Sequence, residues 1–145
     1  YYQTKEQSSV SEDKDKAYIH VKTGIREIDT MIAVLKEHYN GIYRVSLETD
    51  SVHRILMPSY LGYNEDEENF SKLLSKYINE SVHSDYHRAV ISFLNYDAIK
   101  RQILEGKTPT ITYKKTNCEA VKLSVYKLSD DKDDVKDTLW VFAKN

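Results

Sequence analysis

Apolar residues near the start of the chain recur at the spacing of an α-helix. The positions are three and four residues apart, so they share one face of a helix over residues 25–39. The pair Asn40-Gly41 follows this stretch and predicts its C-terminal cap. The apolar face consists of Ile25, Ile28, Ile32, Leu35 and Tyr39.

After this helix the apolar period changes to two. Residues 42–48 alternate apolar and polar side chains, and residues 52–57 form a second apolar stretch after the turn residues Thr49-Asp50-Ser51. The pattern predicts a β-hairpin. Three further strands are predicted towards the C-terminus, over residues 110–115, 120–128 and 139–143.

The middle of the chain returns to helical spacing. We predict a helix over residues 66–81, and the acidic run Glu65–Glu68 carries the charge that a helix N-terminus favours. A second helix is predicted to begin near Ser84 and Asp85, and Asn95 separates it from a third. With helices between the strands, the order predicts an α+β fold: one five-stranded antiparallel sheet with helices packed on one face.

Length and composition are those of a single domain. The chain has 145 residues and one cysteine, Cys118, so no disulfide can form within it and a cytoplasmic location is expected. The net charge of -2 argues against nucleic-acid binding. No apolar run is long enough to span a membrane, so no membrane contact is expected of this segment. We expect residues 1–24 to form a polar linker or a helical lead-in, and residues 25–145 to form the folded domain. The chain begins with Tyr1 rather than Met, which indicates a segment of a longer protein.

Three stretches of the sequence resemble PAS domains, the sensory modules of bacterial signalling proteins. In the second stretch, His83, Asp85 and Arg88 keep part of the His-Pro-Asp-Asp-Arg sequence that many PAS domains carry, with Ser84 in place of the proline. The resemblance implies a PAS-like five-stranded antiparallel sheet with helices on one face, preceded by an N-terminal helix. The three stretches are residues 41–50 (GIYRVSLETD), 82–88 (VHSDYHR) and 140–145 (WVFAKN).

A narrower resemblance concerns the output of the module. The helical insert over residues 95–106 and the tyrosine-rich strands are similar to the PAS domains that precede GGDEF diguanylate cyclase domains. The resemblance implies a non-catalytic sensory or regulatory segment. Its partner would be a C-terminal output domain of the same chain, a diguanylate cyclase or a histidine kinase.

The inner face of the predicted sheet is where a small-molecule ligand would lie. Large side chains on this face either fill the core or leave a pocket between sheet and helices, and the pattern is compatible with both. We expect any cavity to be lined by Tyr43, Val45, Phe93, Ile111, Tyr113, Leu123 and Val125.

No metal or cofactor is predicted. His83 and His87 are four residues apart, but no third ligand is near in sequence, so we expect them to form capping hydrogen bonds. Their polar neighbours argue against haem. Flavin-adduct cysteines of photosensory PAS domains lie on a helix, whereas Cys118 follows Asn117 in a predicted turn, which argues against flavin.

The N-terminal helix offers a surface for dimer formation. We expect its apolar face, Ile25, Ile28, Ile32 and Leu35, to pair with its twin in a homodimer. Two alternatives are a small enzyme of the α+β cone type with an apolar pocket, and a ligand-free dimerisation module with a filled core. The enzyme is the weaker alternative, because no carboxylate lies within an apolar face, where its pKa would be raised towards neutrality.

Overall fold

The described part of the chain belongs to two units. The computed structural model describes residues 26–57, 59–62, 69–128 and 135–145. By its internal contacts the chain divides into residues 1–37 and residues 38–145. The predicted boundary after residue 24 and the acidic run Glu65–Glu68 lie outside the described residues.

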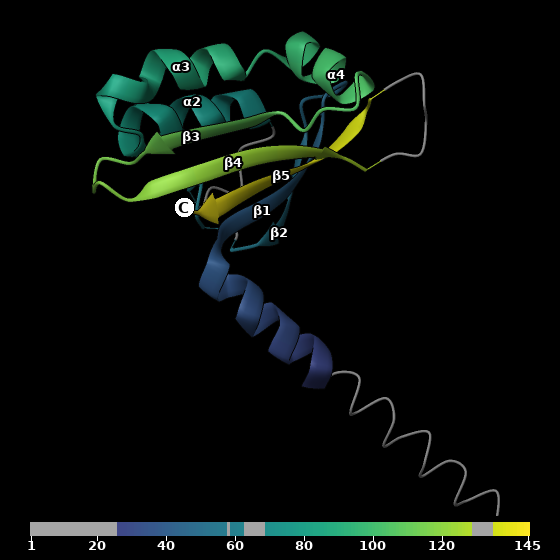
Figure 1. The fold of residues 1–145 in the computed structure, drawn as a ribbon, viewed down its shortest axis with the longest axis vertical. Helices are drawn as coiled ribbons and strands as arrows, with labels where there is room; N and C mark the ends of the chain where they lie inside the picture. The colour runs from purple at the N-terminus through teal and green to yellow at the C-terminus, as the bar shows by residue number, and fades with distance from the viewer. Residues whose placement is uncertain (1–25, 58, 63–68, 129–134) are drawn as a thin grey trace, which may run out of the picture. The chain divides into compact units, whose positions relative to one another are not determined.

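The second unit is built on one antiparallel sheet, whose strands are β1 (Tyr39–Ser46), β2 (Val52–Leu56), β3 (Thr110–Lys114), β4 (Ala120–Lys127) and β5 (Asp137–Lys144). Their order across the sheet is β2-β1-β5-β4-β3 (Figure 1). The last strand, β5, is therefore central and pairs with β1 on one side and β4 on the other. The arrangement confirms the predicted α+β class and its five strands.

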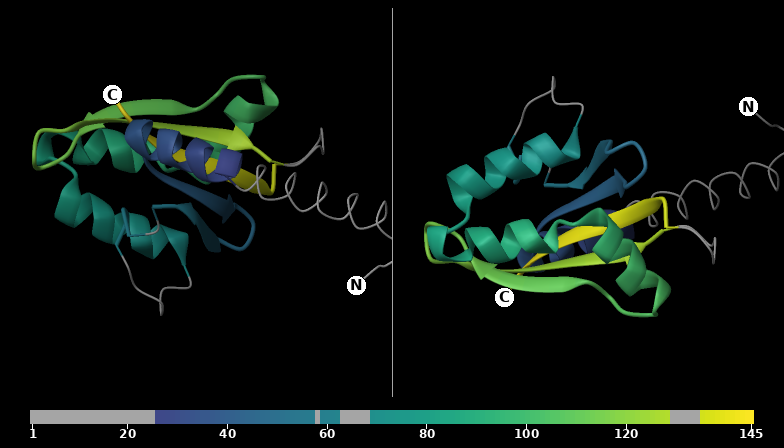
Figure 2. Two further views of the ribbon diagram at one scale, coloured as in Figure 1. Left: turned by 90° about the horizontal axis from the view of Figure 1, so that it is seen from below. Right: turned by 90° about the horizontal axis from the view of Figure 1, so that it is seen from above.

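The helices described in this unit are α2 (Phe70–Ser81), the 3-10 helix η1 (Ser84–Tyr86), α3 (His87–Phe93) and α4 (Tyr96–Leu104). They lie on the same face of the sheet (Figures 1 and 2). Both longer helices begin at an asparagine cap. The Asn69 side chain accepts from the Lys72 N–H at 3.1 Å, and the Asn95 side chain accepts from the Ala98 N–H at 3.2 Å.

The predicted start of the first of these helices, at residue 66, is wrong. Asn69 has an extended backbone, with φ -127° and ψ 119°, and α2 begins at the next residue. The side chain of Asn69 caps the helix, so the acidic residues lie ahead of the helix rather than in its first turn. Asn95 does separate α3 from α4 as predicted.

The predicted end of the N-terminal helix is also wrong. The helix covers described residues 26–38, and Tyr39, Asn40 and Gly41 already belong to β1. Gly41 is needed for close packing, because a Cβ there would lie 2.9 Å from Tyr43 Cε2 and 3.2 Å from Tyr60 Cβ. Sequence reasoning mistook this requirement for a cap. None of the helices in the described ranges is long and apolar enough to cross a membrane.

Trp140 lies at the centre of the core. It is fully buried on β5, and its ring meets a ring from each of the three α-helices of this unit described above: Phe70 of α2, Phe93 of α3 and Tyr96 of α4. The centroid distances are 5.0, 6.4 and 6.3 Å, and the rings meet edge to face, which aromatic pairs favour.

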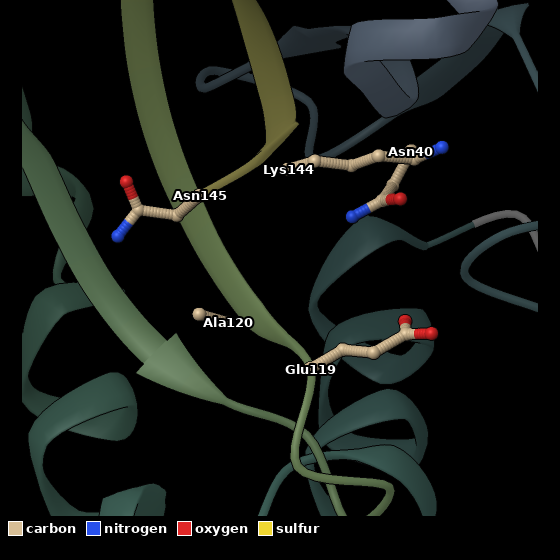
Figure 3. Close-up of a pocket in the computed structure, with 5 residues that line it drawn as sticks. All are labelled: Asn40, Glu119, Ala120, Lys144 and Asn145. Carbon is tan, nitrogen blue, oxygen red and sulfur yellow. The ribbon is translucent and has the colours of Figure 1, made fainter.

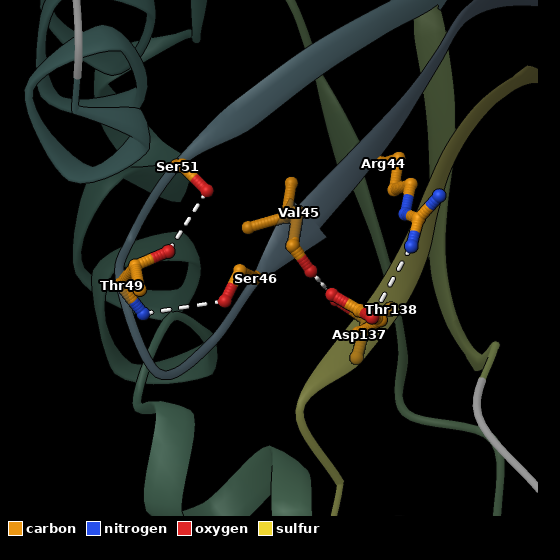
Figure 4. A network of polar contacts seen from close by, with 7 residues as sticks. All are labelled: Arg44, Val45, Ser46, Thr49, Ser51, Asp137 and Thr138. Carbon is orange, nitrogen blue, oxygen red and sulfur yellow. Dashed lines mark hydrogen bonds and ion pairs between the residues drawn. The ribbon is translucent and has the colours of Figure 1, made fainter.

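The buried polar groups around Trp140 are satisfied within the sheet. The indole N–H donates to Thr138 Oγ1 at 2.9 Å, and the Thr138 hydroxyl donates to the carbonyl of Val45 at 2.9 Å. Figure 4 shows this second bond from β5 to β1, beside the 3.2 Å ion pair between Arg44 and Asp137. A buried N–H or O–H group that lacks a hydrogen-bond partner lowers the stability of the fold. The two bonds remove this cost for Trp140 and Thr138.

Asp50 joins the β1–β2 turn to two helices. It has a positive φ of 57°, its carbonyl accepts from the Phe70 N–H at 2.8 Å, and its carboxylate accepts from the Ser71 N–H at 3.2 Å. The same carboxylate accepts from the Tyr96 hydroxyl at 2.5 Å. One aspartate thus fixes the start of α2 and the start of α4 against the hairpin. The neighbouring turn residues Thr49 and Ser51 hold each other through their hydroxyls (Figure 4).

Replacing Gly41 with Ala tests the close packing of β1. We expect a loss of about 1–3 kcal/mol in the free energy of unfolding, because the new methyl overlaps the ring of Tyr43 and crowds the Cβ of Tyr60. Urea denaturation measures the loss. Thr112→Ala, at an exposed strand position, is the control and is expected to change it by less than about 0.5 kcal/mol. Equal effects of the two changes would contradict the packing role.

Replacing Asp50 separates its acceptor role from its charge. Asp50→Ala removes the acceptor for Ser71 and Tyr96, so we expect a loss of about 1–3 kcal/mol in the free energy of unfolding. Asp50→Asn is expected to lose less, since its amide oxygen still accepts and asparagine tolerates a positive φ. Thermal unfolding of both variants, with Glu80→Ala on an exposed position of α2 as control, measures the difference. Identical losses for Ala and Asn would refute this role.

Candidate functional site

The seven predicted pocket residues come together on the inner face of the sheet. Five of them are buried in one hydrophobic cluster, and Phe93 and Ile111 pack against it half-buried. Six of them converge because β1, β3 and β4 each turn alternate residues towards the helices, and Phe93 packs against them from α3. The five buried residues are Tyr43, Val45, Tyr113, Leu123 and Val125.

A chain of tyrosine hydroxyls runs through this inner face. The Tyr77 hydroxyl of α2 is hydrogen-bonded to the Tyr113 hydroxyl of β3 and, at 2.7 Å, to the hydroxyl of Tyr60 in the segment after β2. Tyr77 and Tyr113 are 3% and 2% exposed, so their hydroxyls depend on each other for partners. The chain therefore ties helix, edge strand and loop together through polar groups inside an apolar core.

Burial controls the acidity of these hydroxyls. It raises the pKa of Tyr77 and of Tyr113 far above the usual value of 10.0. The charges of Tyr113 and Tyr60 raise the pKa of Tyr77 further, whereas for Tyr113 the charge of Tyr60 raises the pKa and the hydrogen bond with Tyr77 lowers it. Burial also raises the pKa of Tyr60, partly offset by hydrogen bonds that include one with the Asn40 side chain. All three are neutral hydrogen-bonding groups and poor acids at neutral pH.

Tyr43 anchors the segment that follows β2. Its hydroxyl donates to the Met57 carbonyl at 3.2 Å and accepts from the Leu61 N–H at 3.1 Å. Burial raises the pKa of Tyr43 to about 12, although the hydrogen bond from Leu61 acts in the opposite direction. Its ring also meets Phe142 edge to face at 5.8 Å. Tyr43 thus holds the backbone on either side of Tyr60, which belongs to the hydroxyl chain.

A polar recess lies at the end of the sheet where β1 begins and β5 ends. Its volume is about 350 Å³, and Figure 3 shows Asn40 and Lys144 on one side of it and Glu119 on the other. The Lys115 ammonium lies 3.9 Å from the carboxylate of Glu119 and 5.1 Å from the centre of the Tyr60 ring. The full lining is Asn40, Glu119, Ala120, Lys144 and Asn145.

Sequence reasoning missed both the recess and two of the three tyrosines. Of the seven predicted residues, Tyr113 lines a second, smaller hollow of about 130 Å³ that shares Ala120 and Asn145 with the recess. Tyr60 lies in a stretch without periodicity. The spacing around Tyr77 indicated only that its side chain lies on the buried face of a helix. The abundance of tyrosine, 12 in the chain, was the one available signal.

The histidines serve the backbone, as predicted. His83 Nδ1 accepts from the Asp85 N–H at 3.2 Å and so caps η1, and His87 Nε2 is 2.6 Å from the Val82 carbonyl. Cys118 is exposed, with φ 68°, in the turn between β3 and β4. Within the described ranges, no group of three or more His, Cys, Asp or Glu side chains is arranged to hold a metal ion.

The predicted dimer face is exposed on the N-terminal helix. Ile28, Ile32 and Leu35 are exposed there, and so are Met31 and Val34, which widens the apolar face beyond the predicted stripe. The fourth predicted residue, at position 25, lies outside the described residues.

Comparison with solved structures finds a likeness in fold. No protein-family model and no curated protein sequence matches the chain. The fold is similar to the crystal structure of a sensory box histidine kinase/response regulator from Burkholderia thailandensis E264, with 15% identity and a TM-score of 0.43. The match covers 72% of this chain and 75% of that chain. The fold assignment itself rests on the strand order and helix placement described above.

Replacing Tyr77 with Phe tests the hydroxyl chain through pH. The folded state keeps a Tyr77 proton that the unfolded chain releases above pH 10.0, so the free energy of unfolding falls as the pH rises past this value. Each such tyrosine contributes up to about 1.4 kcal/mol per pH unit. We expect Tyr77→Phe to make the slope between about pH 10 and 12 shallower by one proton, measured by urea denaturation at several pH values.

The control is Tyr126→Phe, which removes an exposed hydroxyl on β4 and is expected to keep the wild-type slope. At pH 7, Tyr77→Phe is also expected to lose about 1–2 kcal/mol, because Tyr60 and Tyr113 lose a partner. If Tyr77→Phe keeps the wild-type dependence of the free energy of unfolding on pH, the Tyr77 hydroxyl titrates alike in the folded and unfolded states, which contradicts the prediction.

Proposed function

We propose that this chain is a non-catalytic PAS-type sensory or relay module of a bacterial signalling protein. The observation that carries the proposal is the pairing of β1 with β5, in which Tyr39 lies opposite Ala143. The first strand after the N-terminal helix is thereby hydrogen-bonded to the last strand of the unit. Any change in packing beneath these two strands acts on both ends of the unit at once.

The inner face of the sheet is the proposed sensing surface. The ring of Trp140 lies on this face and meets a ring from each α-helix described in the unit. A ligand between sheet and helices would therefore act on contacts that hold all of these helices. To shift the module it must bind two arrangements of the helices with different affinity. The raised pKa values of Tyr77 and Tyr113 make these hydroxyls unsuited to acid–base catalysis, which favours sensing over the enzyme alternative.

The finer parts of the proposal follow the PAS resemblance. We propose a cytoplasmic module without haem or flavin that controls a C-terminal diguanylate cyclase or histidine kinase. The ring nitrogens His83 Nδ1 and His87 Nε2 are engaged with the backbone, which supports a role without haem. Visible absorption of the purified protein tests the cofactor, and a Gly-Gly-Asp/Glu-Glu-Phe sequence in the reading frame beyond Asn145 tests the cyclase.

A ligand-free dimerisation module is the second candidate. The specific observation in its favour is that Tyr43, Val45 and Val125 are at most 1% exposed, as expected of a filled core. It differs from the first candidate only in binding nothing on the inner face.

Trp140 fluorescence distinguishes the two candidates. It is the single tryptophan, so its emission reports the packing between sheet and helices. For a sensory module we expect a metabolite from a screen to shift its emission. Ile111→Ala, at the rim of the predicted pocket, should change the apparent Kd by about tenfold, whereas Ile91→Ala, 59% exposed on α3, should not. Absence of any ligand-induced shift would favour the ligand-free module.

The proposed homodimer is tested on the N-terminal helix. Ile28→Asp combined with Ile32→Asp places charges on the apolar face, and we expect a dimer to become a monomer in light scattering. Glu27→Lys, an exposed polar position of the same helix, is the control and should remain dimeric. A wild-type protein that stays monomeric at high concentration would contradict this interface.

A further inference from the structure

The polar recess at the end of the sheet has the size and charge pattern of a small-ligand site. Its volume of about 350 Å³ lies near the lower end of the range typical of ligand pockets, roughly 300–1,000 Å³. Ala120 is the one apolar residue in its lining, and the others supply one carboxylate, one ammonium and two amides. Figure 3 shows the carboxylate of Glu119 across the recess from Lys144 and Asn40.

The two charges of the recess are available to a ligand. Among the residues that the structure describes, no carboxylate side chain lies within ion-pair distance of the Lys144 ammonium. Glu119 is 64% exposed at its side chain, and its one ion pair in the described ranges is the 3.9 Å contact with Lys115. A pair this long, with an exposed carboxylate, contributes little energy, so Glu119 is free to bind another cation.

We propose that this recess binds a small zwitterion of the free α-amino acid class. Its carboxylate would lie against Lys144, its ammonium against Glu119, and the amides of Asn40 and Asn145 would complete the hydrogen bonds. A ligand with only negative charge would face Glu119, and one with only positive charge would face Lys144. Opposite charges in the lining of one recess therefore favour a ligand that carries both.

The recess is connected to the interior of the unit. The Asn40 side chain is near enough to Tyr60 to lower the pKa of its hydroxyl, and this hydroxyl is hydrogen-bonded to Tyr77, which is in turn bonded to Tyr113. A ligand that engages the Asn40 amide changes the surroundings of Tyr60 and so acts on a chain that links α2 to β3. This inference rests on the proposed sensory function and adds a ligand class and a second site, at the end of the sheet, which acts on the inner face through Tyr60.

Calorimetric titration of the 145-residue chain tests the proposal. The probes are the standard L-amino acids, each titrated separately, followed by the decarboxylated amine and the N-acetyl derivative of any that bind. We expect at least one amino acid to bind, and both derivatives to bind at least about tenfold more weakly, because each lacks one charge.

Matched variants locate the binding. Lys144→Gln and Glu119→Gln are each expected to weaken binding at least about tenfold, while Lys122→Gln, an exposed β4 position outside the recess, keeps the wild-type Kd. Circular dichroism and thermal unfolding confirm that each surface variant is folded. The proposal is overturned if no amino acid binds with a Kd below about 10 mM, or if both recess variants bind as wild type.

Trp140 fluorescence separates failure of this site from failure of the sensory function. If amino acids do not bind but another metabolite shifts the emission, the recess proposal fails and the sensory module stands. If an amino acid binds in the recess without changing Trp140 emission or the activity of the full-length parent, the site stands and the sensory role fails. If nothing binds at all, both proposals fall.

Discussion

The burial of Trp140 is the contact on which the rest of the unit depends. Trp140 lies on the central strand, and its ring contacts Phe70 of α2, Phe93 of α3 and Tyr96 of α4. An unpaired indole N–H would lower stability in such a core, but it donates a hydrogen bond to the Thr138 hydroxyl. This hydroxyl in turn donates to the Val45 carbonyl on β1. Trp140 therefore holds the helices to the sheet, and its partner Thr138 couples β5 to β1.

The second organising feature is the use of tyrosine as a core residue. Tyrosine brings the apolar area that a five-stranded sheet needs under its helices, and a hydroxyl that must find a partner when buried. Here the hydroxyls of Tyr60, Tyr77 and Tyr113 satisfy one another, and Tyr43 satisfies the backbone of the segment after β2. Polar connections thus cross an apolar core and reach the recess at Asn40, so the same residues that stabilise the fold connect its surface to its interior.

Regular elements were predictable because burial of one face leaves a periodic signal. The alternation around Trp140 and Phe142 predicted β5, and the helical spacing through Leu73 and Tyr77 predicted α2. Errors arose where a residue has two possible uses. Gly41 serves as a helix cap in many sequences, but here it lets the Tyr43 and Tyr60 side chains approach the backbone, a requirement invisible without those neighbours.

The sequence alone determined the α+β class, the strands and helices of the domain and the identity of most core residues, because local periodicity records which face is buried. The tertiary structure decided which groups meet. The hydroxyl chain joins positions 60, 77 and 113, and the recess joins positions 40, 119 and 144. These positions are far apart along the chain and come together only when β5 enters between β1 and β4, so no local pattern could reveal them.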